Sequence, residues 1–367
     1  MRTRTLGRTD VEVTELSYGA AGIGNLYRPV ADEEAAAAID AAWDAGIRTF
    51  DTAPHYGLGL SERRLGEALR ARPRDTYTVS TKVGRLLVPA SGDGHGDDLA
   101  NGFAVPANLR RVWDFSADGV RRSLEASLHR LGLDRVDIVL LHDPDDHAEQ
   151  ALEEAYPALE RLRGEGVVGA IGVGMNQSAL PARFLRETDI DVVLLAGRYT
   201  LLEQESLTEL LPEAAARGRS VLIGGVLNSG LLTDPAPGAT YDYAPAPEAV
   251  LHRARRLKAV TERHGVPLRA AALHFPLGHP AVASVLTGAR STDEVRDTVE
   301  RLRAPVPAAL WDELRAEGLL APDVPVPTPR TTPPDTSPDT PFEGTPSPEE
   351  STASPSTRRR TARSPRN

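Results

Sequence analysis

Four residues with acid–base chemistry stand at, or just after, the ends of three successive β-like runs: Asp51, Tyr56, Lys82 and His142. A tyrosine hydroxyl has an unperturbed pKa of about 10, so it exchanges a proton at neutral pH only where a nearby cation stabilises its phenolate. Lys82 could supply that cation, and Asp51 could hold the ammonium group in place. His142 could donate to, or orient, a substrate oxygen. This set suits proton exchange with a carbonyl or hydroxyl oxygen, coupled to hydride transfer to or from a nicotinamide.

Lysine itself is rare in this chain. Of the 42 lysine and arginine residues, only Lys82 and Lys258 are lysine. Arginine stays charged in nearly every protein environment, whereas an ammonium group can shift its own pKa and that of a neighbour. Lys258 lies in the polar helical run HRARRLKAVTERHG, which is typical of a solvated face. Lys82 lies between the runs that carry Asp51 and His142, which predicts a role in the same site.

Strand-like and helix-like segments alternate along residues 1–321, which we interpret as one domain. The β-rich apolar runs lie at 14–20, 47–53, 77–84, 135–142, 167–174, 190–197, 219–225 and 281–288. Helical periodicity marks 32–45, 61–72, 116–131, 148–164, 178–187, 203–217, 247–277 in two pieces, and 291–303. Alternation of this kind predicts an α/β fold with parallel strands, and eight repeats predict a closed (β/α)₈ TIM barrel. RTLGRTDVEV, before the first barrel strand, predicts an N-terminal β-hairpin across the barrel bottom.

The active site of such a barrel forms where the strands end at its C-terminal face. Neighbouring strands lie about 4.8 Å apart, so side chains at three successive strand ends can meet above the barrel. We therefore expect Lys82 to lie between the carboxylate of Asp51 and the hydroxyl of Tyr56. The stretch GEGVVG, 164–169, has dinucleotide-fingerprint spacing but ends a helix and opens a strand, the reverse of the required context. We interpret it as a helix C-cap.

Composition limits the partners of the chain. A formal net charge of −10 argues against a nucleic-acid surface. No run approaches the 18 apolar residues of a membrane helix, and the start lacks the apolar segment of a signal peptide, so we expect a cytoplasmic protein. The absence of cysteine removes disulfides and cysteine-ligated zinc. Residues 322–367 are rich in Pro, Ser and Thr and predict a disordered C-terminal tail. The expected partner is a small-molecule substrate; the sequence does not indicate an oligomeric state.

Several stretches resemble the aldo-keto reductase superfamily, in the order in which that family carries them: FDTAPHYGLGLSERRLGEAL, VSTKVGR, SLEASLHRLGLDRVDIVLLHDPD, IGVG followed by Asn176, and HPAVASVLTGARSTDEV. The resemblance covers residues 4–304 and is closest to the branch of D-threo-aldose and L-fucose dehydrogenases, indicated by LLHDPD, IGG and NSGLL. It implies that Asp51, Tyr56, Lys82 and His142 are the catalytic residues. It also implies transfer of hydride to or from the anomeric or carbonyl carbon of a small, sugar-like substrate.

The resemblance further implies a nicotinamide cofactor, NAD or NADP, extended across the barrel mouth without a Rossmann domain. The implied cofactor contacts are Asn176, Gly224, Leu227, Gly288, Arg290, Ser291 and Glu294. Asn176 matches the position that holds the nicotinamide carboxamide, with Gly174 where many relatives have serine. Ala196 departs from a glutamine that assists this contact in relatives. Gly224 and Leu227 stand where relatives place an aromatic ring, so an aliphatic side chain is expected to pack against the nicotinamide.

The stretch TGARSTDEV leads into the last predicted barrel helix, whose N-terminal amides suit a phosphate. Ser291 and Glu294 also have the spacing of a capping box, so capping alone is the alternative for both. Many NADP-preferring relatives place an arginine at the position of Glu294. A carboxylate there would repel a 2′-phosphate, whereas Arg290 could attract one or stack on adenine. On balance we expect NAD.

A long insertion at 85–114 interrupts the third repeat and contains Phe103 and Trp113, with Phe115 just after it. Loops of this length are usually functional lids or mobile segments. We hypothesise that Trp113, or else Phe115, stacks on the face of a sugar. The alternative for Trp113 is buried packing.

Three other functions fit parts of the same pattern. One is an NADPH-dependent aldehyde or carbonyl reductase without sugar preference, and another is a non-enzymatic barrel that only binds a nucleotide. The third is a metal-dependent hydrolase that uses HDPDDH, 142–147, and His55. We expect no metal, because a lysine between the strands can provide the positive charge that a metal would supply.

Overall fold

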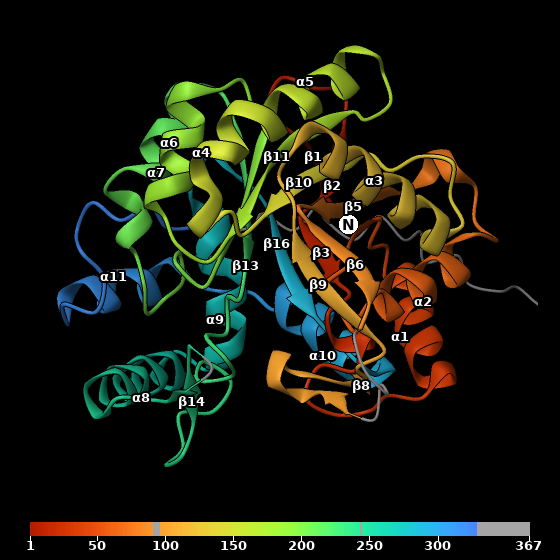
Figure 1. Cartoon of the computed structure of the whole chain (residues 1–367). Helices are drawn as coiled ribbons and strands as arrows, with labels where there is room; N and C mark the ends of the chain where they lie inside the picture. Colours follow the sequence, from red (N-terminus) through yellow and green to blue (C-terminus); the bar gives the residue numbers. More distant parts are fainter. Residues whose placement is uncertain (91–95, 243, 329–367) are drawn as a thin grey trace, which may run out of the picture. The chain divides into compact units, whose positions relative to one another are not determined.

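The computed structural model describes residues 1–90, 96–242 and 244–328. At its centre, eight parallel strands close into a barrel, each hydrogen-bonded to the next (Figure 1). In barrel order they are β3 (Leu16–Gly19), β4 (Thr49–Asp51), β5 (Thr78–Val83), β10 (Ile138–His142), β11 (Ala170–Met175), β12 (Val192–Ala196), β13 (Ser220–Gly224) and β16 (Val282–Gly288). Each overlaps one of the eight predicted runs, so the predicted (β/α)₈ barrel is confirmed.

Helices surround this barrel and cover its outer face (Figure 1). They are α1 (Asp32–Asp44), α2 (Leu60–Leu69), α3 (Ala117–Leu131), α4 (Ala148–Gln150), α5 (Tyr156–Gly164), α6 (Ala179–Glu187), α7 (Leu210–Ala216), α8 (Glu248–Arg263), α9 (Leu268–His274), α10 (Thr292–Arg303) and α11 (Ala308–Ala316). A π-helical turn, Ala151–Ala155, joins α4 to α5. The sequence analysis did not predict α11, which buries Trp311. None of the helices in the described part of the chain is both long and apolar enough to span a membrane.

Alternation along the strands decides which side chains enter the barrel, because successive residues of a strand point to opposite faces. On β10, Leu140 belongs to the cluster inside the barrel, and Leu141 to the cluster shared with the helices. The next inward position is His142. The same alternation points Lys82 on β5 and Asp51 on β4 inward at the end where the strands finish. Strand periodicity thus directs three of the four predicted catalytic residues to one place.

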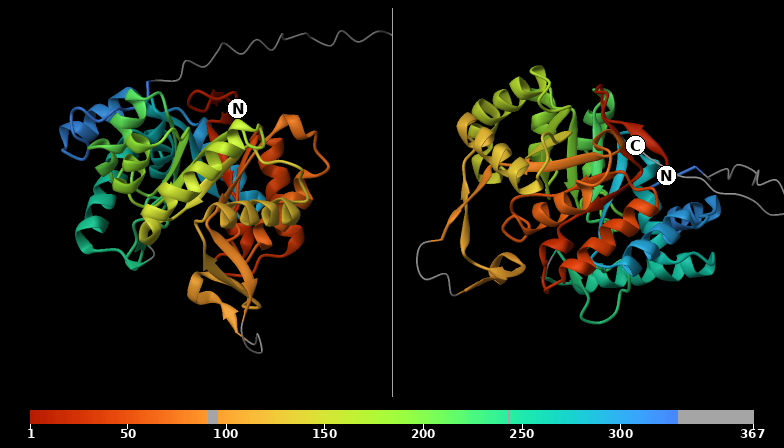
Figure 2. Two further views of the ribbon diagram at one scale, coloured as in Figure 1. Left: turned by 45° about the horizontal axis from the view of Figure 1, so that its top comes forward. Right: turned by 90° about the vertical axis from the view of Figure 1, so that its right-hand side faces the viewer.

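The bottom of the barrel is closed by the predicted N-terminal hairpin, β1 (Thr3–Thr5) paired with β2 (Glu12–Thr14). Leu6 in its turn is fully buried within the interior cluster. The backbone N–H of Gly7 donates to Ser220 Oγ at 2.7 Å. Figure 2 shows this hairpin at the end of the barrel opposite the insertion after β5. The hairpin therefore plugs the barrel at the end away from the predicted catalytic residues.

The insertion after β5 forms two small antiparallel pairs (Figure 2). Strand β6 (Arg85–Pro89) pairs with β9 (Leu109–Trp113), and β7 (Asp97–Asp98) pairs with β8 (Phe103–Pro106). A 3₁₀ turn, η3 (Leu99–Asn101), connects β7 to β8. Phe103 forms a β-bridge with Leu26, and the N–H of Tyr27 donates to Gly102 O at 2.7 Å. These bonds tie the insertion to the loop that follows β3, at the C-terminal face of the barrel.

Residues 322–328, the first part of the predicted tail, continue along the barrel domain. Val324 is buried, and its carbonyl oxygen accepts a hydrogen bond from Arg315 Nη2 at 2.8 Å. The backbone at Val326 and Pro327 lies so close to Gly278 that a Cβ there would be about 2.5 Å away. The remainder of the predicted tail, 329–367, lies outside the described residues.

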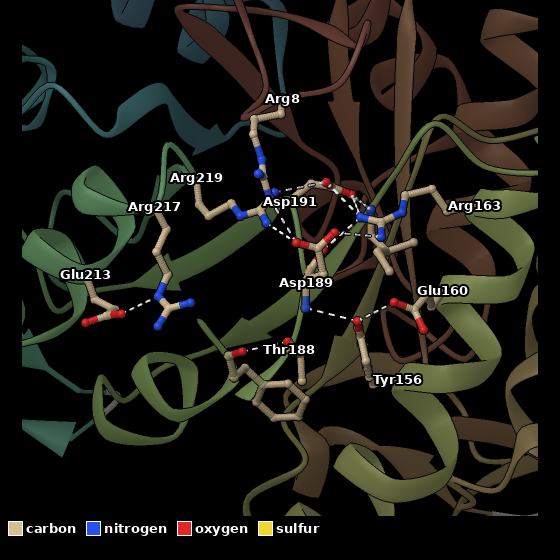
Figure 3. Close-up of polar contacts among 12 residues, drawn as sticks. Arg8, Tyr156, Glu160, Arg163, Thr188, Asp189, Asp191, Glu213, Arg217 and Arg219 are labelled. Carbon is tan, nitrogen blue, oxygen red and sulfur yellow. Dashed lines mark hydrogen bonds and ion pairs between the residues drawn. The ribbon is translucent and has the colours of Figure 1, made fainter. Parts of the chain in front are cut away.

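An ion-pair cluster stands at the barrel bottom, where Arg8, Arg163 and Arg219 meet Asp189 and Asp191 (Figure 3). Asp191 is almost completely buried, and its carboxylate accepts from Arg163 Nη1 and from the N–H of Ile171 at 3.0 Å. Asp189 is half-exposed and pairs with all three arginines. The two carboxylates thus differ mainly in burial.

Asp191→Ala is expected to lower the free energy of unfolding by about 3 kcal/mol, because it removes the buried carboxylate that neutralises Arg163 and leaves the buried N–H of Ile171 without its acceptor. Asp189→Ala provides a comparison in the same cluster: its carboxylate is half-exposed and, among the described residues, bonds to no buried backbone N–H, and Arg163 and Arg219 both keep Asp191 as a partner, so it should cost less than Asp191→Ala. Urea denaturation of both variants measures the difference. Equal losses for the two variants would show that burial does not set the strength of this cluster.

Candidate active site

Lys82 is buried at the top of the barrel with three oxygen partners. Its Nζ donates to Asp51 Oδ2 at 2.7 Å, to the carbonyl oxygen of Thr52 at 3.0 Å and to Tyr56 Oη at 3.2 Å. The carbonyl of Thr52 is a partner that the sequence did not indicate. The structure therefore brings the predicted carboxylate, ammonium and phenol into direct contact.

Register and loop geometry explain this contact. Asp51 on β4 pairs with Ser80 on β5, whose Oγ donates to Asp51 Oδ1 at 2.8 Å, so both carboxylate oxygens have a donor. Tyr56 lies in the loop after β4, followed by Gly57 with a φ of 61°. A Cβ on Gly57 would lie 2.2 Å from the carbonyl oxygen of Gly24. Glycine at this position thus lets the loop pack closely enough to aim the phenol at Lys82.

The environment of Tyr56 acts on its pKa in two directions. Burial raises the pKa of the hydroxyl above its usual value near 10, and the adjacent Lys82 ammonium opposes that rise. Burial is the larger effect. Lys82 thus acts on Tyr56 in the predicted direction, but in the protein without ligands it does not cancel the effect of burial on the pKa. In this state Tyr56 is a phenol and a proton donor.

Two histidines lie beside the phenol. His142, at the end of β10, has its ring 6.0 Å from that of Tyr56, and His55 has its ring 5.7 Å from that of His142. Burial, helped by Arg85 and other nearby cations, lowers the pKa of His142 well below 6.5 and that of His55 to about 2. Both imidazoles are therefore neutral, so each has one N–H donor and one acceptor nitrogen.

These side chains border a cavity of about 530 Å³ at the barrel mouth. Asn176 lines the same cavity, as the sequence predicted, and so do Gly174 and Ala196. The insertion contributes residues 99–103, among which the sequence analysis noted only Phe103, as an aromatic of the insertion. Nothing in the sequence distinguishes Leu99 from other loop residues, because its place depends on how the insertion folds back.

The two aromatic residues proposed to contact a sugar lie elsewhere. Phe115 is fully buried beneath Gly84, so its predicted substrate role is wrong. Trp113 is partly exposed, stacks on Phe115 at a centroid distance of 5.9 Å and carries Arg85 over its ring at 4.2 Å. It is not among the residues that line the cavity. The insertion instead presents Phe103, whose ring lies 6.1 Å from that of Tyr56.

A second cavity, of about 620 Å³, adjoins the first through Leu26 and Tyr27, which line both. Leu227, Gly288 and Arg290, three of the predicted cofactor contacts, line this second cavity. Gly224 is not a lining residue, although its neighbour at 225 is. The structure thus separates the predicted contacts into a group beside Tyr56 and a group towards α10.

Ser291 and Glu294 make the contacts of a helix N-terminus. Ser291 Oγ accepts from the N–H of Glu294 at 3.3 Å, and Glu294 Oε2 accepts from the N–H of Arg290 at 2.7 Å. Arg290 also donates from its side chain to the carbonyl of Leu26 at 3.2 Å. Capping therefore accounts for the contacts of Ser291 and Glu294 in the protein alone, as the alternative reading allowed.

The barrel mouth fits an extended dinucleotide. On one side the last inward residues of β5 and β10 are Lys82 and His142. On the other side the inward positions at the strand ends carry almost no side chain: Gly174, Ala196, Gly224 and Gly288. A Cβ on Gly224 would meet only ordinary contacts, at 3.7 Å and beyond. This shallow floor joins two adjacent cavities and leaves room for a flat ring beside Tyr56, with the rest of a long ligand running towards Arg290.

The model of the aldo/keto reductase family matches residues 15–316, which include the barrel and the lining of both cavities. The chain belongs to the aldo/keto reductase family. The resemblance inferred from the motifs is thereby confirmed, and this aldo/keto reductase is an NAD(P)-dependent oxidoreductase. Within the described residues, no group of three or more histidine, aspartate or glutamate side chains is placed to hold a metal ion.

Two curated relatives resemble this aldo/keto reductase over most of its length. It is 48% identical over 314 residues to D-threo-aldose 1-dehydrogenase of a Pseudomonas species, covering 84% of this chain and 95% of that protein. It is 41% identical over 338 residues to pyridoxal 4-dehydrogenase of Microbacterium luteolum, covering 87% and 98%. Among solved structures, an aldo-keto reductase from Bacillus halodurans in its holo form aligns with a TM-score of 0.69 and 26% identity, covering 87% and 96%. The Pseudomonas and Microbacterium relatives are both dehydrogenases by name.

Proposed function

We propose that this aldo/keto reductase is an aldose dehydrogenase, which oxidises the anomeric carbon of a small sugar and yields the lactone. The observation that carries the proposal is the contact of Tyr56, Lys82 and Asp51 beside a cavity of about 530 Å³. The 48% identity to D-threo-aldose 1-dehydrogenase supports the choice of an aldose. The predicted cytoplasmic location belongs to the same proposal.

In the oxidising direction Tyr56 accepts the proton of the anomeric hydroxyl, for which it must first be a phenolate. Lys82 stabilises that phenolate, and Asp51 keeps the ammonium charged and directed at it. Neutral His142 donates an N–H to the same substrate oxygen. Bound NAD(P) supplies the hydride acceptor. In the reducing direction Tyr56 returns its proton to the carbonyl oxygen.

The residues proposed to hold the cofactor are Asn176, Gly224, Leu227, Gly288, Arg290, Ser291 and Glu294. Asn176 would bind the carboxamide beside Tyr56, and Leu227 would pack against the nicotinamide ring. Near the N-terminus of α10, the carboxylate of Glu294 would repel a 2′-phosphate, which favours NAD over NADP. Glu294 is held on the N–H of Arg290 at 2.7 Å, which supports its position in the first turn of the helix.

Initial rates decide between the proposal and its rivals. Purified protein should oxidise L-fucose, D-arabinose or related aldoses with NAD⁺ at a higher kcat/KM than it reduces aromatic aldehydes with NADPH, and it should bind NAD⁺ more tightly than NADP⁺ in a fluorescence titration. Faster reduction of aldehydes with NADPH would identify a carbonyl reductase instead. Cofactor binding without turnover of either substrate class would identify a nucleotide-binding barrel.

A further inference from the structure

Two polar side chains of the catalytic cavity take no part in the proposed proton transfer. His55 and Asp143 both line the cavity, and both lie close to His142. The His55 ring lies 5.7 Å from the His142 ring, and Asp143 Oδ2 lies 3.6 Å from His142 Nε2. When the reacting oxygen of a substrate contacts His142, the side chains of His55 and Asp143 therefore lie near the substrate atoms next to the reacting carbon.

Asp143 is held rigidly by its backbone and its side chain. Its φ of 43° is unusual for a residue other than glycine, and its N–H donates to the carbonyl of Gly174 at 3.0 Å. Arg85 donates to Asp143 Oδ2, and the guanidinium of Arg85 rests 4.2 Å over the ring of Trp113. Within the described residues both side-chain contacts of Asp143 use Oδ2, so Oδ1 is left for a ligand.

His55 is fixed by its own set of contacts. Its ring packs edge-on against Phe103 at 5.2 Å, and its carbonyl oxygen accepts from Arg111 Nη2 at 2.8 Å. Arg111 is held in turn by the carboxylate of Asp98. Nδ1 of His55 is buried and has no hydrogen-bond partner among the described residues. A buried polar atom of this kind normally has a partner, and because His55 lines the cavity its ring can approach a bound molecule.

The two groups match the chemistry of vicinal hydroxyls. An ionised carboxylate only accepts hydrogen bonds, a neutral imidazole donates one and accepts one, and a hydroxyl can do both. We propose that His55 and Asp143 form a hydroxyl-binding subsite for the ring hydroxyls next to the reacting carbon, which makes the enzyme select polyhydroxylated substrates. The inference rests on the proposed function and names what selects its substrate class. In this arrangement Trp113 positions Asp143 through Arg85 and does not contact the sugar itself.

The test compares two substrates that differ only in these hydroxyls and the exocyclic carbon: L-fucose, and 2-hydroxytetrahydropyran, which keeps the anomeric hydroxyl on a bare six-membered ring. With NAD⁺ and the holoenzyme, Asp143→Asn should lower kcat/KM for L-fucose about 10- to 100-fold more than for 2-hydroxytetrahydropyran, because a charge-assisted hydrogen bond is lost only with the sugar. His55→Phe, which keeps a ring of similar size, should also reduce the ratio of the two kcat/KM values. Asp146→Asn, an exposed carboxylate of the same loop, should leave the ratio unchanged.

Equal losses for both substrates would overturn the subsite, since they would mean that Asp143 and His55 only maintain the fold of the site. If the wild-type enzyme does not oxidise L-fucose, the aldose proposal fails, but the subsite is still tested by reduction. Glyceraldehyde carries a hydroxyl next to its carbonyl and propanal does not, so Asp143→Asn must then lower kcat/KM for glyceraldehyde more than for propanal. An equal effect on these two aldehydes would also overturn the subsite.

Discussion

Tyr56→Phe should lower kcat/KM for the oxidation of an aldose by about 10²- to 10⁴-fold, the range that a positioned general acid–base contributes. The substitution removes only the hydroxyl oxygen that lies 3.2 Å from Lys82 Nζ. The ring remains to fill the space between Phe103 and His142. Steady-state rates with saturating NAD⁺ measure the loss.

Tyr199→Phe is the matched control for this prediction. Tyr199 is also fully buried, and its hydroxyl has no hydrogen-bond partner among the described residues, so its loss breaks no contact. Its activity should stay close to that of the wild type. Cofactor titrations should give similar Kd values for both variants and the wild type. A Tyr56→Phe enzyme that retains more than a tenth of wild-type kcat/KM would remove Tyr56 from the mechanism.

Lys82→Met should lower the rate of oxidation at neutral pH by about 10²-fold or more and move its pH dependence. Oxidation needs phenolate, so kcat/KM should rise with pH through the pKa of Tyr56; reduction needs phenol and should fall over the same range. Burial raises the pKa of Tyr56 and Lys82 opposes that rise. Removing Lys82 takes away the opposing influence, so both curves should shift to higher pH. Rates in both directions across an alkaline pH series measure this shift.

The chain offers its only other lysine as a control. Lys258 is exposed on α8 and pairs with Asp234 at 3.2 Å, so Lys258→Met should leave both pH profiles unchanged. Lys82→Arg keeps the charge but places a larger, planar group among Asp51, Thr52 and Tyr56, and it should not restore activity. A Lys82→Met enzyme whose pH profile matches that of the wild type would show that the ammonium does not act on Tyr56.

The arrangement of Asp51, Lys82 and His142 could be predicted because it follows from local rules. Strand periodicity sets the inward face, and parallel strands of a closed barrel finish at the same end. Lys82 therefore had to lie near both neighbours once the barrel was inferred. Tyr56 followed less directly, because it lies on a loop whose path depends on Gly57 packing against Gly24.

The insertion shows where this kind of prediction stops. Trp113 and Phe115 differ in no local pattern from Phe103, yet only Phe103 lines the catalytic cavity. The difference comes from the pairing of β6 with β9 and from the bridge between Phe103 and Leu26, which join residues far apart in the chain. Sequence-local rules hold no information on such long-range pairs.

The pKa of the Tyr56 hydroxyl also depends on surroundings that no motif describes. The motifs identify a cation beside Tyr56, but the pKa reflects how completely the packed barrel mouth excludes water, and there burial outweighs the cation. Residue types and their spacing were thus enough to establish the barrel and to bring Asp51, Lys82 and His142 to the same end of it, since both follow from short-range periodicity. The cavity walls, the subsite at His55 and Asp143, and the balance of charge against burial came from the folded molecule, because each sums contacts between segments distant in the chain.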